Sequence, residues 1–122
     1  MRLKSILGVA AALLLVAVAS NAAVSRVVVV QTSDAAAYVK AIEQGKALIK
    51  AKGGTGAIRV WRARYAGENA GAVVVAIEYA SLEALAKDEV KLSTAPDLRA
   101  WVQSLDKLRK VVSDSIYEEL VP

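Results

Sequence analysis

The sequence contains no cysteine and no histidine, and these two absences exclude much chemistry. Zinc, copper and non-haem iron sites would lack their usual sulfur and nitrogen ligands. Nucleophilic catalysis by Ser-His or Cys-His pairs is excluded outright. Because disulfides cannot form, packing alone must hold the fold together. We therefore expect neither a metal site nor a bound cofactor.

A strong charge of one sign is also lacking. The chain of 122 residues has 16 Lys and Arg against 12 Asp and Glu. Two of the basic residues, Arg2 and Lys4, belong to an N-terminal leader, and without them the count is 14 basic against 12 acidic residues. A chain so nearly balanced gives no support for binding to nucleic acid or to an anionic membrane.

The first 22 residues have the three parts of a secretory signal peptide. Arg2 and Lys4 form a basic start, and residues 6–19 are apolar throughout apart from one glycine. The small residues of "SNAA" then suit cleavage after Ala22. The apolar run is shorter than the roughly 20 residues that span a membrane. We therefore expect a cleaved signal peptide over 1–22 and a periplasmic or secreted product that is free of the membrane.

The remaining residues, 23–122, have the length of one domain. Segments rich in β-branched residues predict strands, and segments with apolar residues at helical spacing predict helices, with Gly and Pro between them. The expected strands are 24–33, 57–66, 72–80 and 111–122, and the expected helices are 34–52, 81–93 and a further piece over 98–108. This order predicts an α+β, ferredoxin-like βαββαβ fold, in which both helical segments cover one face of a four-stranded antiparallel sheet.

The two strands that flank "GENAG", residues 67–71, are expected to form a hairpin. Pairing Tyr65 with Val73 places Trp61 and Tyr65 on the face that the helices cover. A slip of one residue would exchange the faces of one strand relative to the other. The opposite, half-apolar face would then carry Arg62, Arg64 and Glu78. Such a face is usually covered, and a second copy of the chain is the simplest cover.

The βαββαβ order, the interrupted second helix and the run "RVWRARYAG…GAVVVAIEYASLEALAK" resemble the dimeric α+β barrel superfamily. That group includes antibiotic-biosynthesis-monooxygenase-type and NIPSNAP-like domains. The resemblance covers residues 24–122 and implies a homodimer in which two sheets pack face to face with the helices outside. None of these residues forms a motif that is diagnostic of one activity, and a fold alone does not define a function.

The candidate ligand-binding residues are Arg62, Arg64 and Glu78, which would orient an anionic or carbonyl-bearing ligand inside a barrel. The alternative is that these side chains form ion pairs across the dimer contact or face water. Trp61 and Tyr65 would line a hydrophobic pocket or, in the alternative, belong to the core beneath the helices.

Three functions remain open. The sequence favours a non-enzymatic, exported barrel protein that binds a small organic ligand. The first alternative is a cofactor-independent enzyme of the monooxygenase or isomerase type, acting on a small aromatic or polyketide-like molecule. Tyr38, Tyr79 and Tyr117 are the candidate proton donors for such chemistry, but no neighbouring base is predicted, so no catalytic residue is assigned. The second alternative is a protein-interaction module that uses the open sheet face.

Overall fold

The computed structural model describes residues 22–65 and 67–121 and confirms the ferredoxin-like α+β fold. Four strands form one antiparallel sheet in the order β2-β3-β1-β4. Residues 1–21 of the predicted signal peptide lie outside the described residues. The elements are β1 (Val24–Gln31), α3 (Ala35–Ala51), β2 (Ala57–Arg62), the short 3-10 helix η1 (Gly67–Asn69), β3 (Val73–Tyr79), α4 (Leu82–Ser93), α5 (Pro96–Leu105) and β4 (Lys110–Glu118).

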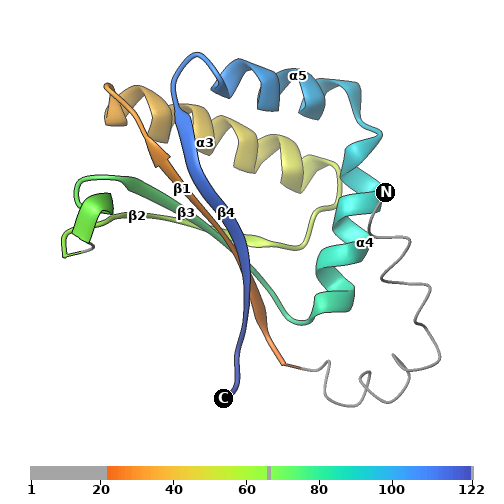
Figure 1. Ribbon diagram of the computed structural model, residues 1–122. Coiled ribbons are helices and arrows are strands. Elements are labelled where there is room, and N and C mark those ends of the chain that lie inside the picture. The colour runs from red at the N-terminus through yellow and green to blue at the C-terminus, as the bar shows by residue number, and fades with distance from the viewer. Residues whose placement is uncertain (1–21, 66, 122) are drawn as a thin grey trace.

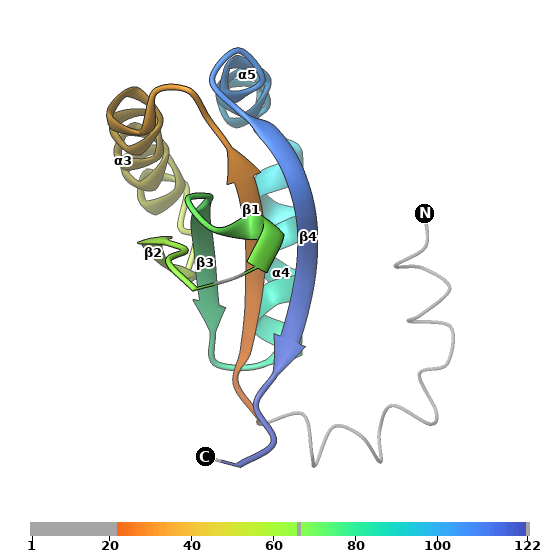
Figure 2. The same ribbon diagram turned by 60° about the vertical axis from the view of Figure 1, so that its left-hand side comes forward.

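The helices and the sheet form two layers. Figure 1 shows α3 and α5 lying side by side over one face of the sheet, while α4 packs towards the end where β3 finishes. In Figure 2 the three helices lie on the same side, and the described part of the chain leaves the other face of the sheet without helical cover. This arrangement matches the expected covered face and open face.

Local sequence explains where the helices begin and end. Asp34 and Ser81 each accept a hydrogen bond from the backbone N–H three residues further on, at 3.0 and 3.1 Å, and so cap α3 and α4. Gly53, with φ of 84°, follows the end of α3. The predicted break at "STAPD" is confirmed, because α4 ends at Ser93 and Pro96 opens α5, where its missing N–H costs nothing.

The core lies between the sheet and the helices α3 and α5. Tyr38 on α3 is completely buried, and Leu105 at the end of α5 is nearly so. The strands contribute β-branched side chains that alternate with residues of the open face. The buried cluster consists of Val28, Val30, Tyr38, Ile42, Val73, Val75 and Leu105.

The hairpin register differs from the prediction by three residues, since Trp61 pairs with Val74 and not with Ile77. The loop is longer than the five residues of "GENAG". It is closed by two backbone hydrogen bonds between Ala63 and the segment 71–72, at 2.9 and 2.7 Å. Because the slip is an odd number of residues, every side chain of β2 lies on the face opposite to the one predicted.

The expected positions of Trp61 and Tyr65 were therefore wrong. Ile58 and Val60 pack under the helices, while Trp61 lies on the open face with 54% of its surface exposed. Tyr65 lies beyond the end of β2, in the loop, and is fully exposed. Neither aromatic side chain belongs to the core of the protomer.

Candidate functional site

The residues predicted to form a polar patch do not come together. Arg62 pairs with Val73 at the end of β2, and its Nη1 donates to the carbonyl of Gly71 at 3.4 Å. Arg64 is exposed in the loop that follows. Glu78 lies at the opposite end of the hairpin, where its Oε1 is 4.0 Å from Nε of Arg59 on the open face. The predicted placement of both arginines beside Glu78 on one face was wrong.

A cleft of about 490 Å³ lies on the other side of the sheet, between the strands and the helices α4 and α5. The sheet forms its floor and α5 forms most of its wall. Its apolar lining includes Val28, Ile77, Leu92, Leu98, Trp101 and Leu105. Its polar lining includes Arg26, Tyr79, Glu89, Arg99, Arg109 and Asp114. We refer to this space as the α5 cleft.

Arg26 lies at the centre of an ion-pair network in the α5 cleft. Its Nε and Nη2 donate to the two carboxylate oxygens of Asp114, at 3.0 and 2.8 Å, and its Nη1 donates to Oε2 of Glu89 at 2.9 Å. These partners raise the pKa of Arg26, and the hydrogen bond that Arg26 donates to Asp114 is the largest cause. The same hydrogen bond lowers the pKa of Asp114 below its usual value near 3.8. Both groups are therefore charged at neutral pH.

Tyr79 places a phenol at the same end of the cleft. Burial raises the pKa of Tyr79 above its usual value of 10.0, and the negative charges of Asp88 and Glu89 add to the effect while Arg26 opposes it. The phenol therefore stays protonated at neutral pH and can donate a hydrogen bond to a ligand. Of the three tyrosines considered as proton donors, Tyr79 is the one that lines the cleft.

Asp88 fixes the loop that runs beside Tyr79. This carboxylate on α4 is 1% exposed and accepts from the backbone N–H groups of Thr55 and Gly56, at 2.7 and 3.2 Å, and from the Thr55 hydroxyl at 3.2 Å. A Cβ at Gly56 would lie 2.6 Å from Ile77 and 2.8 Å from the Tyr79 ring. The absence of a side chain there allows the loop to lie directly against the phenol.

Arg109 enters the cleft from the turn between α5 and β4. Its Nη1 donates to Oη of the buried Tyr38 at 3.1 Å, and the guanidinium carbon lies 6.0 Å from the centre of that ring. Its Nε is buried and has no hydrogen-bond partner among the described residues. Arg26, Arg109 and their carboxylate neighbours were not predicted as site residues. A single arginine within the β-branched strand "VSRVVVV" was a usable signal, because a half-buried charge needs a partner.

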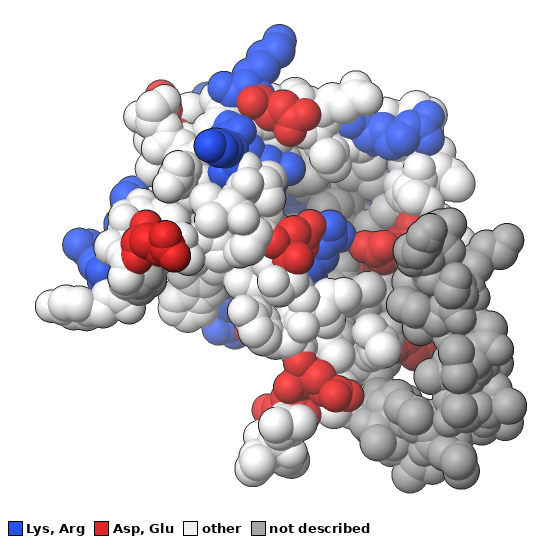
Figure 3. All heavy atoms as spheres, viewed as in Figure 1, with Lys and Arg blue, Asp and Glu red and all other residues white. Residues whose placement is uncertain are grey.

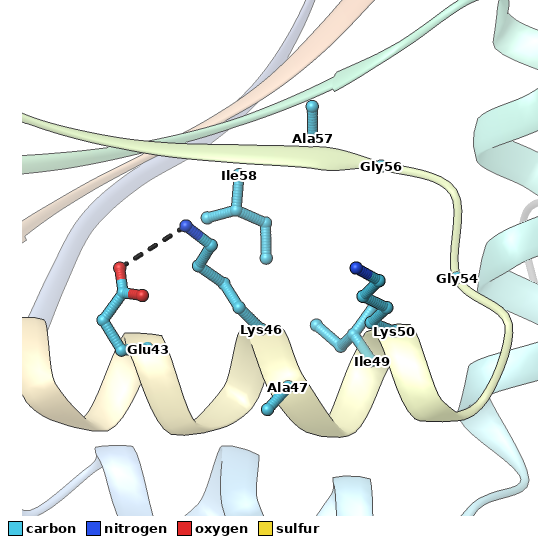
Figure 4. A pocket seen from close by; sticks show the side chains of 9 residues that line it. All are labelled: Glu43, Lys46, Ala47, Ile49, Lys50, Gly54, Gly56, Ala57 and Ile58. Atoms are coloured by element: carbon cyan, nitrogen blue, oxygen red, sulfur yellow. Dashed lines mark hydrogen bonds and ion pairs between the residues drawn. The ribbon is translucent and has the colours of Figure 1, made fainter.

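A second hollow, of about 540 Å³, lies between α3 and the edge strand β2. Figure 4 shows Lys46 reaching from α3 towards β2, with its Nζ 3.4 Å from Oε2 of Glu43. The polar groups here are flexible side chains at the surface of one helix, and Ile58 and glycine backbone form the opposite wall. We regard the α5 cleft as the stronger candidate because its polar groups converge from both strands and helices.

Figure 3 shows how the charged side chains are distributed on one face of the molecule. On the face shown in Figure 3, basic and acidic groups alternate and no single large patch of one sign forms. Within residues 22–65 and 67–121, no three acidic side chains are grouped so as to hold a metal ion. The helices of the described part are all too short or too polar to cross a membrane.

No family model matches the chain, and no curated protein matches it. Several solved structures, in contrast, match the chain in fold. A NIPSNAP-like domain protein from Burkholderia xenovorans aligns with a TM-score of 0.63 and 16% identity, over 84% of this chain and 87% of that one. SnoaB, a cofactor-independent oxygenase from Streptomyces nogalater, aligns with a TM-score of 0.62 and 12% identity, over 83% of this chain and 96% of that one. A candidate antibiotic biosynthesis monooxygenase from Bordetella bronchiseptica aligns with a TM-score of 0.56 and 10% identity, over 83% of this chain and 98% of that one.

These neighbours confirm the resemblance in fold to antibiotic-biosynthesis-monooxygenase-like and NIPSNAP proteins. The chain thus shares the ferredoxin-like α+β fold of these structures, and its own cleft lies between the sheet and the second helical segment. At these identities the likeness concerns the fold alone, and the activity must be argued from the cleft.

Proposed function

We propose that the protein binds a small organic ligand in the α5 cleft. The observation that carries this proposal is the composition of the cleft, in which apolar walls surround converging guanidinium, carboxylate and phenol groups. Small-molecule sites typically have this composition and a volume of roughly 300–1,000 Å³. The site differs from the barrel patch expected from the sequence, because the α5 cleft lies on the helix side of the sheet.

Native mass spectrometry of protein purified from its own host tests this proposal. We expect a mass excess that disappears on denaturation. Val111→Trp should abolish the excess, because Val111 lines the cleft and a larger side chain would fill it. Val112→Trp is the matched control, since Val112 has a nearly equal exposed fraction but lies outside the lining. A bound ligand that persists in the Val111→Trp variant would contradict the cleft as its site.

The open sheet face supports a homodimer as the working form. Val27, Val29, Val74 and Ala76 form an apolar band across β1 and β3, and Trp61 lies beside it on β2. A contiguous apolar band without helical cover favours contact with a second copy, because two-fold dimers are the commonest oligomers.

Light scattering on the mature protein tests the dimer and should give twice the monomer mass. Val74→Lys should then yield a monomer, because it places a charge in the middle of the apolar band. Val90→Lys on the exposed surface of α4 is the matched control and should leave the mass unchanged. A wild-type monomer would overturn this part of the proposal and favour a module that binds a different protein.

The N-terminal sequence supports export, since residues 1–22 combine a basic start, an apolar run and small residues before the expected cleavage point. Expression of the full chain followed by intact-mass analysis should give a product that begins at Ala23. A product that retains the leader and sediments with membranes would contradict the signal peptide.

A cofactor-independent oxygenase is the second candidate function. Two observations favour it: the similarity in fold to SnoaB, and the protonated Tyr79 phenol beside apolar walls that include Trp101. In such chemistry the phenol would donate to a carbonyl or enolate oxygen of the substrate. Oxygen uptake with an ionisable polycyclic phenol should fall in Tyr79→Phe but not in Tyr117→Phe, which alters the open face. Equal uptake by the two variants would rule out this role.

A further inference from the structure

The guanidinium of Arg109 is a half-buried cation of the α5 cleft that has no carboxylate partner in the described part of the chain. Arg26 has two carboxylate partners, Asp114 and Glu89. Arg99 is exposed and donates to the carbonyl of Ser93 at 3.2 Å. Arg109 likewise has no carboxylate within 4.0 Å in the described part of the chain and donates only to the Tyr38 hydroxyl, but unlike Arg99 it is half-buried.

The nearest acid cannot neutralise Arg109 fully. Asp114 is close enough for the positive charge of Arg109 to help lower the pKa of that carboxylate. Both oxygens of Asp114 are nevertheless already hydrogen-bonded to Arg26. The lining as a whole holds three arginines and two acids, so one positive charge is left over.

A buried donor without a partner is unfavourable, and a guanidinium whose donors are not all used can bind a further acceptor. Nε of Arg109 is such a donor. The packing of the guanidinium against Tyr38 holds it in place, because Tyr38 is completely buried in the core. A fixed cation with an unused donor is a suitable partner for an anionic oxygen.

We propose that the ligand of the α5 cleft is a small apolar acid whose anionic oxygen binds Arg109, and this inference rests on the proposed ligand-binding function. The apolar body of the acid would pack against Trp101, Leu105 and Val111, which line the same space. The phenol of Tyr79 is a second donor for a polar substituent at the other end of the molecule. The structure thereby narrows the ligand from any organic molecule to an amphipathic anion.

Two probes of equal size separate the charge from the apolar body: 2-naphthoate and 2-naphthalenemethanol. Calorimetry at neutral pH should show that the wild-type protein binds 2-naphthoate more tightly, by roughly tenfold to a hundredfold, as expected for a charge-assisted hydrogen bond. Arg109→Gln should remove this preference while still binding the neutral probe. Arg64→Gln is the matched control, because it removes the same charge from an exposed loop outside the cleft.

Arg109→Lys keeps the charge and should retain part of the preference, and circular dichroism will show whether each variant is folded. If the wild-type protein binds both probes equally, or if Arg109→Gln keeps the full preference, the charge assignment is wrong while the proposed ligand-binding function stands. If neither probe binds to the wild-type protein, both the inference and the proposed function are contradicted.

Discussion

Arg26 on β1 and Asp114 on β4 are joined by two parallel hydrogen bonds, from Nε to Oδ1 and from Nη2 to Oδ2. The pair links a central strand to its neighbouring edge strand, on the side of the sheet that faces the helices. Glu89 on α4 accepts a hydrogen bond from the remaining nitrogen, Nη1, of the same guanidinium. One arginine therefore connects the floor of the cleft to its helical wall.

The Arg26–Asp114 pair predicts a pH dependence of stability. Because the pKa of Asp114 is lowered in the folded state, the pair stabilises the protein above the unfolded value near 3.8. This stabilisation is lost as the pH falls through the lower folded value. At neutral pH, Asp114→Asn should reduce the free energy of unfolding by about 1 kcal/mol, since the side chain is two-fifths exposed and solvent screens the pair.

Urea unfolding at neutral pH and at about pH 3 measures this effect. The difference in the free energy of unfolding between Asp114→Asn and wild type should be smaller at the lower pH. Glu43→Gln breaks the exposed pair with Lys46 and is the control, with an expected change below roughly 0.5 kcal/mol. A difference between Asp114→Asn and wild type that grows as the pH falls would contradict the assigned sign.

The buried carboxylate of Asp88 should matter far more than an exposed carboxylate on the same helix. Asp88→Ala removes the acceptor for the backbone N–H groups of Thr55 and Gly56 and leaves them unpaired. We expect a loss of about 3 kcal/mol in urea unfolding. Glu83→Ala, in the exposed first turn of α4, should cost less than about 1 kcal/mol. Similar losses for the two variants would show that the Asp88 contacts are not stabilising.

Gly45 on α3 should resist substitution even though alanine is the better helix former. A Cβ at this position would collide with the Trp101 ring, which is held by a 2.9 Å hydrogen bond from its Nε1 to the carbonyl of Ala41. The gain of about 1 kcal/mol in helix propensity is smaller than the 1–3 kcal/mol or so of overpacking. We expect Gly45→Ala to lower the thermal midpoint, with a shift in tryptophan fluorescence, and Gln44→Ala to leave both unchanged. A raised midpoint for Gly45→Ala would refute the contact.

The two tryptophans should respond differently to truncation because they lie on opposite sides of the sheet. Trp101→Ala removes packing in the cleft and should cost about 3 kcal/mol. Trp61→Ala removes a half-exposed side chain from the open face and should cost less than about 1 kcal/mol in the protomer. Denaturation at protein concentrations that favour the monomer measures both. A larger loss for Trp61→Ala would restore the predicted register.

Much of the fold was predictable because its signals are local. The capping side chains Asp34 and Ser81 and the proline at position 96 all act within one turn of their own helix. The β-branched runs of β1 and β3 are long enough to identify buried strands without a partner. These features define the element order, and the element order defines the ferredoxin-like topology.

The candidate site was not predictable in the same way. Arg26 is 88 residues from Asp114 and 63 residues from Glu89 along the chain, so nothing local connects them. The placement of Trp61 depended on a register that the longer loop shifted by an odd number of residues. Arg109 carried no signal in the sequence, since its importance comes from an unpaired Nε that only the packed structure reveals.

The amino-acid sequence by itself determined the order of the elements, the ends of α3 and α4 and the absence of histidine and cysteine chemistry, because each depends on residue type or on neighbours within a few positions. The tertiary structure alone decided which face of the sheet carries each side chain of β2 and which charges meet in the α5 cleft. Those outcomes depend on the pairing of distant segments, where a shift of one position moves a side chain through the sheet.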